Sequence, residues 1–188
     1  MTKSIMIVGV GGQGTLLASR ILGNTAIGEG YDVKVSEVHG MSQRGGSVVT
    51  YVKFGDKVYS PIVGLGEADI ILAFEQLEAY RALPYLKKDG VMIVNDQKIN
   101  PMPVITGAAQ YPENILEKIS ADAQLVTVPA LSLAEKAGNI KAVNVALIGV
   151  MAKTTDIAKE KWIETIRTTV PPKFLDVNLK AFELGYNL

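Results

Sequence analysis

The sequence predicts an α/β protein with a mainly parallel sheet covered by helices on both faces. Short β-branched runs such as Ser4–Val10 and Val91–Asn95 are typical of buried strands, and helical stretches such as Thr15–Glu29 separate them. This alternation favours parallel strands joined by crossover helices. With 188 residues, 48% of them hydrophobic, the chain can bury a real core. We therefore expect one three-layer, Rossmann-like domain spanning residues 1–188.

Further elements follow from the same periodicities. An antiparallel hairpin is expected where Ser47–Phe54 and Lys57–Ser60 flank a turn at Gly55 and Asp56. The remaining strands are predicted at Tyr31–Val38, Asp69–Glu75 and Gln124–Val128, and a helix at Leu77–Leu86.

The C-terminal third is predicted to be helical. Val143–Ala152 is apolar nearly all round, which indicates a buried helix, and Ile157–Val170 carries one apolar stripe. The helix after Pro171 and Pro172 has one polar face and two apolar flanks. Such a helix could pack on two sides within its own core, or against a partner, and both alternatives stay open.

Composition excludes several classes of function. The chain has no cysteine, so it cannot form disulfides, use a thiolate or ligate an iron–sulfur cluster or zinc through sulfur. Its single histidine, His39, cannot build a multi-histidine metal site. The net charge is zero and the basic residues are not clustered, which argues against nucleic-acid binding. No signal peptide or apolar run of bilayer length is present, so we expect a cytoplasmic protein without membrane contact.

A glycine loop follows the first strand. Gly9, Gly11 and Gly14 have the spacing G-x-G-x-x-G between a strand and a helix, which is the dinucleotide fingerprint, and Glu37 lies near the position that would hold a ribose hydroxyl. Three alternatives remain: a dinucleotide, another anion at the helix start, or a purely structural turn. A phosphate loop of the Walker type is excluded, because Thr15 occupies the lysine position. The residues of this loop expected to face an anion or cofactor are Gly11, Gly12, Gln13 and Gly14.

A second polar loop follows the next strand. In open α/β sheets, loops after the carboxyl ends of strands form the ligand crevice, so both loops are expected to face it if their strands are parallel neighbours. Arg44 offers a fork for a carboxylate or phosphate, and the glycines beside it allow close backbone approach. We expect a recognition surface or active-site entrance made of Glu37, His39, Met41, Ser42, Gln43, Arg44, Gly45 and Gly46.

Two other interpretations apply to this second loop. Gly40 and Ser42 match half of a nucleophile elbow, but the G-x-S-x-G motif would need glycine at the position of Arg44, so a hydrolase is disfavoured. The loop could also simply cap the sheet, with His39 hydrogen-bonded and Arg44 solvated. No residue is expected to perform bond-breaking chemistry.

Together these stretches resemble a known family along essentially the whole chain. The chain is similar to the gamma-type domain of 2-oxoacid:ferredoxin oxidoreductases, and within that family most similar to the small (beta) subunits of the indolepyruvate enzymes. The second loop and the closing Pro-Pro-Lys segment are the most specific parts. The matching segments are Val8–Gly14, Glu37–Val48, Ala68–Glu75 and Val170–Gly185.

The resemblance implies an accessory subunit in anaerobic metabolism. Such complexes oxidatively decarboxylate a 2-oxoacid with coenzyme A as co-substrate and reduce ferredoxin. The resemblance places thiamine diphosphate, Mg²⁺ and [4Fe-4S] clusters on a large alpha subunit, with none bound by this chain alone. This chain also lacks the G-D-G…N pattern for the magnesium of thiamine diphosphate, Lys88-Asp89-Gly90 being its nearest approach. Alternatives are an autonomous NAD(P)- or flavin-dependent oxidoreductase, or a gamma subunit acting on pyruvate or 2-ketoisovalerate.

Overall fold

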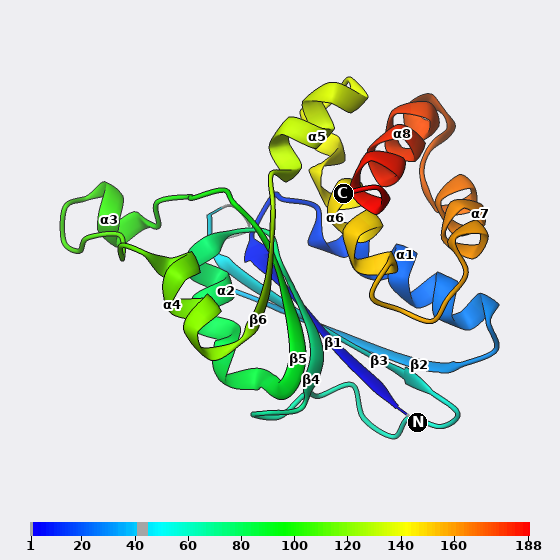
Figure 1. The fold of residues 1–188 in the computed structure, drawn as a ribbon, viewed down its shortest axis with the longest axis horizontal. Helices are drawn as coiled ribbons and strands as arrows, with labels where there is room; N and C mark the ends of the chain where they lie inside the picture. The colour runs from blue at the N-terminus through cyan, green and yellow to red at the C-terminus, as the bar shows by residue number, and fades with distance from the viewer. Residues whose placement is uncertain (1, 41–44) are drawn as a thin grey trace.

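Six strands form one mixed sheet in the computed structural model, which describes residues 2–40 and 45–188 (Figure 1). The sheet order is β2-β3-β1-β4-β5-β6. β1, β4, β5 and β6 run parallel, whereas β3 pairs antiparallel with β1 on one side and with β2 on the other. The α/β class predicted from the sequence is confirmed. The strands are β1 Lys3–Val10, β2 Asp32–His39, β3 Ser47–Gly55, β4 Ala68–Ala73, β5 Leu86–Asn95 and β6 Gln124–Val128.

The antiparallel hairpin exists, but its second arm was predicted wrongly. Ser47–Gly55 pairs with Asp32–His39, and Lys57–Ser60 forms no strand. The physical reason is that both edges of β3 are already occupied, by β1 and β2, so the chain after Gly55 has no free edge to join. Instead, the Asp32 carboxylate accepts a hydrogen bond from the Val58 backbone N–H at 2.8 Å, which ties the segment after β3 to the start of β2.

Helices cover the two faces unequally (Figure 1). α1, α5, α6, α7 and α8 contribute to the core on one face, and α2 and α4 contribute to the core on the other. The short α3 stands away from the sheet on an arm. Within the described residues no helix is both long and apolar enough to cross a membrane. The first face carries α1 Thr15–Gly28, α5 Ala130–Ala137, α6 Val143–Ala152, α7 Lys159–Thr169 and α8 Leu175–Tyr186; the second carries α2 Gln76–Ala82 and α4 Ile115–Asp122; α3 is Met102–Ile105.

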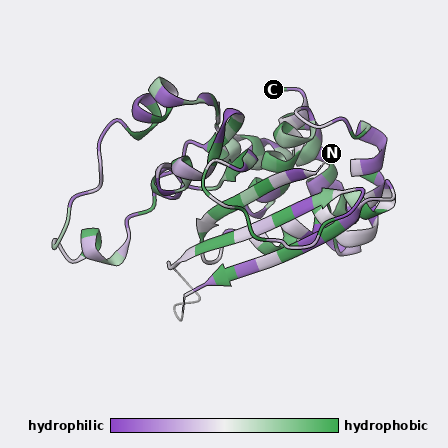
Figure 2. Ribbon diagram, turned by 90° about the horizontal axis from the view of Figure 1, so that it is seen from below, coloured by the Kyte–Doolittle hydropathy of each residue, from purple (hydrophilic) through white to green (hydrophobic). Residues whose placement is uncertain are grey.

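Two hydrophobic cores lie on the two faces of the sheet. Side chains alternate along β1, so Ile5 and Ile7 join the core under α1 and α6, while Met6 and Val8 join the core under α2 and α4. All residues of β1 after Lys3 are buried, as expected for a central strand covered on both faces. Figure 2 shows β2 and β3 in the foreground, where no helix covers the face turned to the viewer, whereas α1 packs against their other face.

The terminal helix α8 packs within its own chain. It contacts α5, α6 and α7, and Ala181 and Phe182 are fully buried. Two glycines allow α6 and α8 to touch through their backbones. A Cβ on Gly149 would lie 2.3 Å from the Phe182 carbonyl oxygen, and one on Gly185 would lie 2.0 Å from the Ala146 carbonyl oxygen. The sequence left open whether this helix packs in its own core or against a partner, and the structure shows packing in its own core.

We expect Gly185→Ala to destabilise the protein by about 3 kcal/mol, because its methyl group must push two helix backbones apart. The measurement is the free energy of unfolding from urea titration followed by circular dichroism. Gly28→Ala is the matched control, since a Cβ there meets nothing within 4 Å and Gly28 also lies in a helix. Equal stability of the two variants would contradict the backbone contact.

Candidate functional site

The two loops predicted to form a crevice meet at the carboxyl edge of the parallel strands. The prediction applied if β1 and β2 were parallel neighbours, and they are not, because β3 lies between them. The loops touch nevertheless, since β3 begins at the same edge where β1 and β2 end. The Gly11 N–H donates to the Gly46 carbonyl oxygen at 2.8 Å, and the Gly45 N–H donates to the Gly11 carbonyl oxygen at 3.4 Å.

An open groove of about 380 Å³ lies where the loops meet. It brings together five of the predicted site residues from sequence positions more than twenty apart. Glu37 lies there with its carboxylate 3.3 Å from the Thr50 hydroxyl, which donates to it, and the His39 ring nitrogen Nδ1 lies 3.2 Å from the Gly40 carbonyl oxygen. The groove is lined by Gly11, Gly12, Gly14, Thr15, Leu16, Glu37, His39 and Val48.

Gln13 was predicted to face a ligand, but its side chain is used to hold the sheet edge. Its Oε1 accepts from the Val10 N–H at 2.8 Å, and its Nε2 donates to the Phe74 carbonyl oxygen at 3.0 Å. The same Nε2 lies 3.4 Å from Oε1 of Gln97. The ends of β1 and β4 and the segment after β5 are therefore joined by one amide, and Gln13 is not among the groove residues.

The glycines of the first loop have separate structural causes. A Cβ on Gly9 would lie 2.9 Å from Oε1 of Gln13, so this glycine makes room for the amide. Gly14 precedes α1 with a left-handed φ of 83°, and a Cβ there would lie 2.6 Å from Nδ2 of Asn144. Gly12 has φ 100° and open space around it, so it needs glycine for its backbone alone. Spacing that fits the dinucleotide fingerprint is thus used partly for packing.

The groove has the chemistry of a weak, backbone-based anion site beside a carboxylate. The first N–H groups of a helix have no partner within the helix, and α1 has no acidic residue in its first turn, so nothing nearby on that helix competes for them. Glu37 would repel an anion and attract a cation from the opposite wall. In the described part of the chain no group of three histidine, aspartate or glutamate side chains could hold a metal ion.

Four of the predicted loop residues, Met41, Ser42, Gln43 and Arg44, lie outside the described residues. The loop is anchored just after them by a contact that the sequence analysis missed. The Ser47 hydroxyl donates to the Glu78 carboxylate at 2.5 Å, and Arg81 Nη1 donates to the other oxygen of that carboxylate at 2.5 Å. The loop is therefore tied to the first glycine loop on one side and to α2 on the other.

A second buried carboxylate, Glu75, was also missed. It is 1% exposed and caps α2, accepting from the Glu78 N–H at 2.9 Å and from the Ile99 N–H at 3.1 Å. The Tyr111 hydroxyl donates to it as well. The signal in the sequence was two glutamates three residues apart between a strand and a helix, the spacing of a side-chain cap. Burial, and then the Glu75 carboxylate, raise the pKa of Tyr111 well above its ordinary value.

These observations define an α/β domain with two covered sheet faces and a groove at the carboxyl edge lined mainly by backbone and small side chains. The chain belongs to the pyruvate ferredoxin/flavodoxin oxidoreductase family, whose model matches residues 4–188. The family resemblance seen in the sequence is confirmed.

Individual relatives agree with this assignment. The chain is 47% identical to indolepyruvate oxidoreductase subunit IorB of Thermococcus kodakarensis, covering 97% of this chain and 93% of the relative. It is 29% identical to the common gamma subunit of the pyruvate/ketoisovalerate oxidoreductases of Pyrococcus abyssi, covering 92% and 89%. The crystal structure of a keto/oxoacid ferredoxin oxidoreductase gamma subunit from Geobacter sulfurreducens superposes with a TM-score of 0.73 at 26% identity, covering 98% and 96%.

We expect Gln13→Ala to lower the free energy of unfolding by about 2 kcal/mol, because the Val10 N–H loses its partner and the Phe74 carbonyl oxygen keeps only its hydrogen bond from Asn95 Nδ2. Urea unfolding measures this loss. Gln110→Ala, at an exposed position on the arm, is the control and should change stability by less than about 0.5 kcal/mol. A Gln13 variant as stable as the control would show that water replaces the amide.

Stability at high pH is expected to depend on Tyr111. Its pKa is raised in the folded state, so its stabilisation is complete below the ordinary tyrosine pKa near 10 and is lost as the pH rises toward the folded value. Between about pH 10 and 12 the wild type should therefore lose stability faster than Tyr111→Phe, by up to about 1 kcal/mol per pH unit after allowing for partial exposure. Tyr59→Phe, at a side chain 84% exposed, should follow the wild type.

Proposed function

We propose that this chain is the small subunit of an indolepyruvate:ferredoxin oxidoreductase. The complex would convert an aryl 2-oxoacid and coenzyme A to an acyl-CoA and carbon dioxide, passing two electrons to ferredoxin. The observation that carries the proposal is the 47% identity to an IorB subunit over 97% of the chain. The 29% identity to a pyruvate/ketoisovalerate gamma subunit makes those 2-oxoacids the weaker candidates.

The cofactors of such a complex would lie in the large partner subunit. Iron–sulfur clusters need thiolate ligands, and this chain has no cysteine. Lys88-Asp89-Gly90, the nearest approach to a magnesium–diphosphate motif, lies inside β5. A Cβ on Gly90 would lie 2.9 Å from the Ala68 carbonyl oxygen, so this glycine serves strand packing and the residues present do not fit the cofactor. Thiamine diphosphate, which would stabilise the carbanion left by decarboxylation, is therefore assigned to the partner.

The groove at the carboxyl edge is the surface that we assign to the partner and its substrates. The turn Gly11–Gly14 would accept an anion, such as a coenzyme A phosphate or a carboxylate of the partner, on the free N–H groups at the start of α1. The loop His39–Ser47 would face the large subunit or the entrance to its active site, with Arg44 as the fork for a carboxylate or phosphate. Its two anchors, at Gly11 and Glu78, support this role by fixing where the loop ends.

The test is co-expression of the chain with a large, cysteine-rich alpha subunit from the same genome, followed by a ferredoxin-reduction assay with indolepyruvate. Arg44→Ala should leave assembly intact and lower kcat/KM at least tenfold, equivalent to the loss of about 1.4 kcal/mol of binding. Arg167→Ala, an exposed arginine on α7, is the control and should keep full activity. Failure to co-purify with a cysteine-rich chain would reject the proposal, and full activity of Arg44→Ala would reject the role of the loop.

One observation favours a second candidate, an autonomous NAD(P)- or flavin-dependent oxidoreductase. The glycine turn and Glu37 lie in one groove, as a bound dinucleotide would require. Against it, β3 separates the ends of β1 and β2 that a dinucleotide fold keeps adjacent. Enhanced NADH fluorescence on adding the purified chain would support the second candidate, and an unchanged signal would exclude NADH binding.

A further inference from the structure

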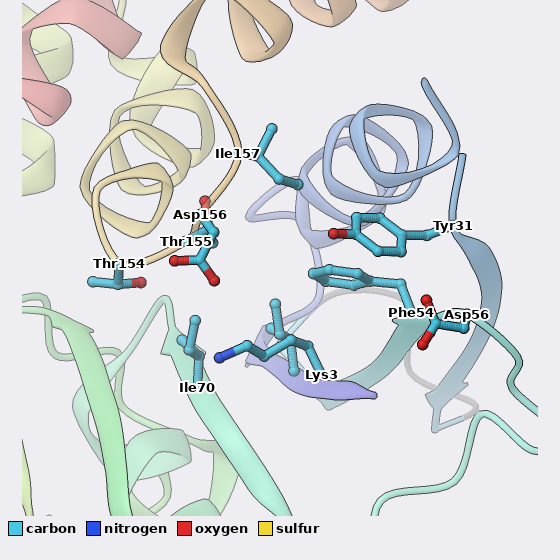
Figure 3. A pocket seen from close by; sticks show the side chains of 10 residues that line it. Lys3, Tyr31, Phe54, Asp56, Ile70, Thr154, Thr155, Asp156 and Ile157 are labelled. Carbon is cyan, nitrogen blue, oxygen red and sulfur yellow. The ribbon is translucent and has the colours of Figure 1, made fainter. Parts of the chain in front are cut away.

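A second cavity, of about 280 Å³, opens at the opposite edge of the sheet, where β1 begins and β3 ends (Figure 3). The turn between α6 and α7 closes it on one side, and Tyr31, just before β2, closes it on the other. This edge holds the amino ends of the parallel strands, so the cavity is separate from the groove at the carboxyl edge. Its size is near the lower end of the range for small-molecule sites, which suits a metabolite rather than a nucleotide.

One half of the cavity is apolar and aromatic. The rings of Tyr31 and Phe54 pack with centroids 5.5 Å apart and planes inclined at 51°. Both rings face the cavity in Figure 3. The buried side chains of Ile5, Ile70 and Ile157 complete this half. A flat ring from a ligand could pack against Tyr31 and Phe54 as aromatic pairs do in protein cores.

The other half of the cavity carries side chains of opposite charge. The Lys3 ammonium points below the turn that bears Asp156 (Figure 3). Among the described residues no ion pair engages Lys3 or Asp156. The cavity is thus lined by one cation, Lys3, and two carboxylates, Asp56 and Asp156. Because no ion pair of the described residues engages Lys3 or Asp156, these two groups favour a ligand that itself carries both charges.

The end of α6 adds acceptors next to Asp156. The hydroxyls of Thr154 and Thr155 donate to the carbonyl oxygens of Met151 and Ala152 at 2.7 and 2.8 Å. Because their hydrogens are used in this way, their remaining lone pairs can only accept. The carboxyl end of a helix also carries partial negative charge. Asp156 and the two threonines therefore form a position suited to an ammonium group, while Lys3 suits a carboxylate.

We propose that this cavity binds a zwitterionic amino acid with an aromatic side chain. The ligand carboxylate pairs with Lys3, its ammonium lies among Thr155 and Asp156, and its ring packs against Tyr31 and Phe54. An aryl carboxylate without an amine could pair with Lys3 but would leave Asp156 without a counter-ion. An aryl amine without a carboxylate could pair with Asp156 but would leave Lys3 without one. This site goes beyond the proposed function, and ligand binding to it can be tested on this chain without the large subunit.

The test is isothermal titration calorimetry of the full chain with L-phenylalanine, L-tyrosine and L-tryptophan. The proposal expects saturable binding of at least one of them. Binding should be at least tenfold weaker for 3-phenylpropionate, which lacks the amine, for phenethylamine, which lacks the carboxylate, and for L-alanine, which lacks the ring. Equal affinity for any of these three analogues would overturn the zwitterion assignment, as would no binding of any aromatic amino acid up to millimolar concentration.

Variants locate the binding. Lys3→Gln and Asp156→Asn should each weaken binding at least tenfold, whereas Lys118→Gln and Asp122→Asn, exposed on the helix α4 of the other face, should not change it. Tyr31→Ala is a further variant that removes one wall at a partly exposed position and should weaken binding without emptying the core. Unchanged binding in these three cavity variants, with folding verified by circular dichroism, would show that the ligand binds elsewhere and would overturn the proposal.

Discussion

The Gln13 amide side chain links segments that are far apart in sequence at the carboxyl edge of the sheet. Gln13 is the point at which β1, β4 and the segment after β5 are joined, through hydrogen bonds of 2.8 and 3.0 Å to backbone groups of the two strands. This arrangement explains why the turn needs glycine at Gly9, where any side chain would meet the amide. The glycine motif has the spacing of a cofactor fingerprint, but the side chain of its polar residue Gln13 forms hydrogen bonds within the protein.

The second constraint at this edge comes from α2. Glu75 and Glu78 are buried and acidic, yet each is supplied with hydrogen-bond donors: backbone N–H groups and Tyr111 for Glu75, and Ser47 and Arg81 for Glu78. Buried charges are tolerated when they are satisfied in this way. The consequence is that three segments far apart in sequence, the end of the polar loop, the start of α2 and the arm around Tyr111, have fixed positions relative to one another. A partner that binds the loop therefore meets a surface with rigid supports.

Much of the fold could be predicted from the sequence, for a specific reason. Strands such as Ser4–Val10 are buried runs rich in β-branched residues that end in glycines, a pattern typical of few other structures. The hairpin failed because Lys57–Ser60 has strand-like residues, and local pattern carries no information on whether an edge is free. The hydrogen bonds of Gln13 were also not evident from the sequence. A polar residue in a glycine turn looks the same whether it meets a ligand or a strand 61 positions away. The neighbours that decide such cases are distant in sequence, as are Glu78 and Ser47.

The insertion of β3 between β1 and β2 has a consequence for the order of synthesis. β2 pairs only with β3 among the described strands, and β1 pairs only with β3 and β4. A nascent chain that has emerged only as far as Gly46 therefore contains two strands and a helix but no hydrogen-bonded sheet. In the usual strand–helix–strand unit, the two strands pair as soon as the second one appears. Here β1 and β2 cannot pair with each other, because the position between them belongs to β3. The part of the chain before β3 must therefore wait for residues 47–55 to emerge from the ribosome, and any fragment cut before them has no native strand pairing.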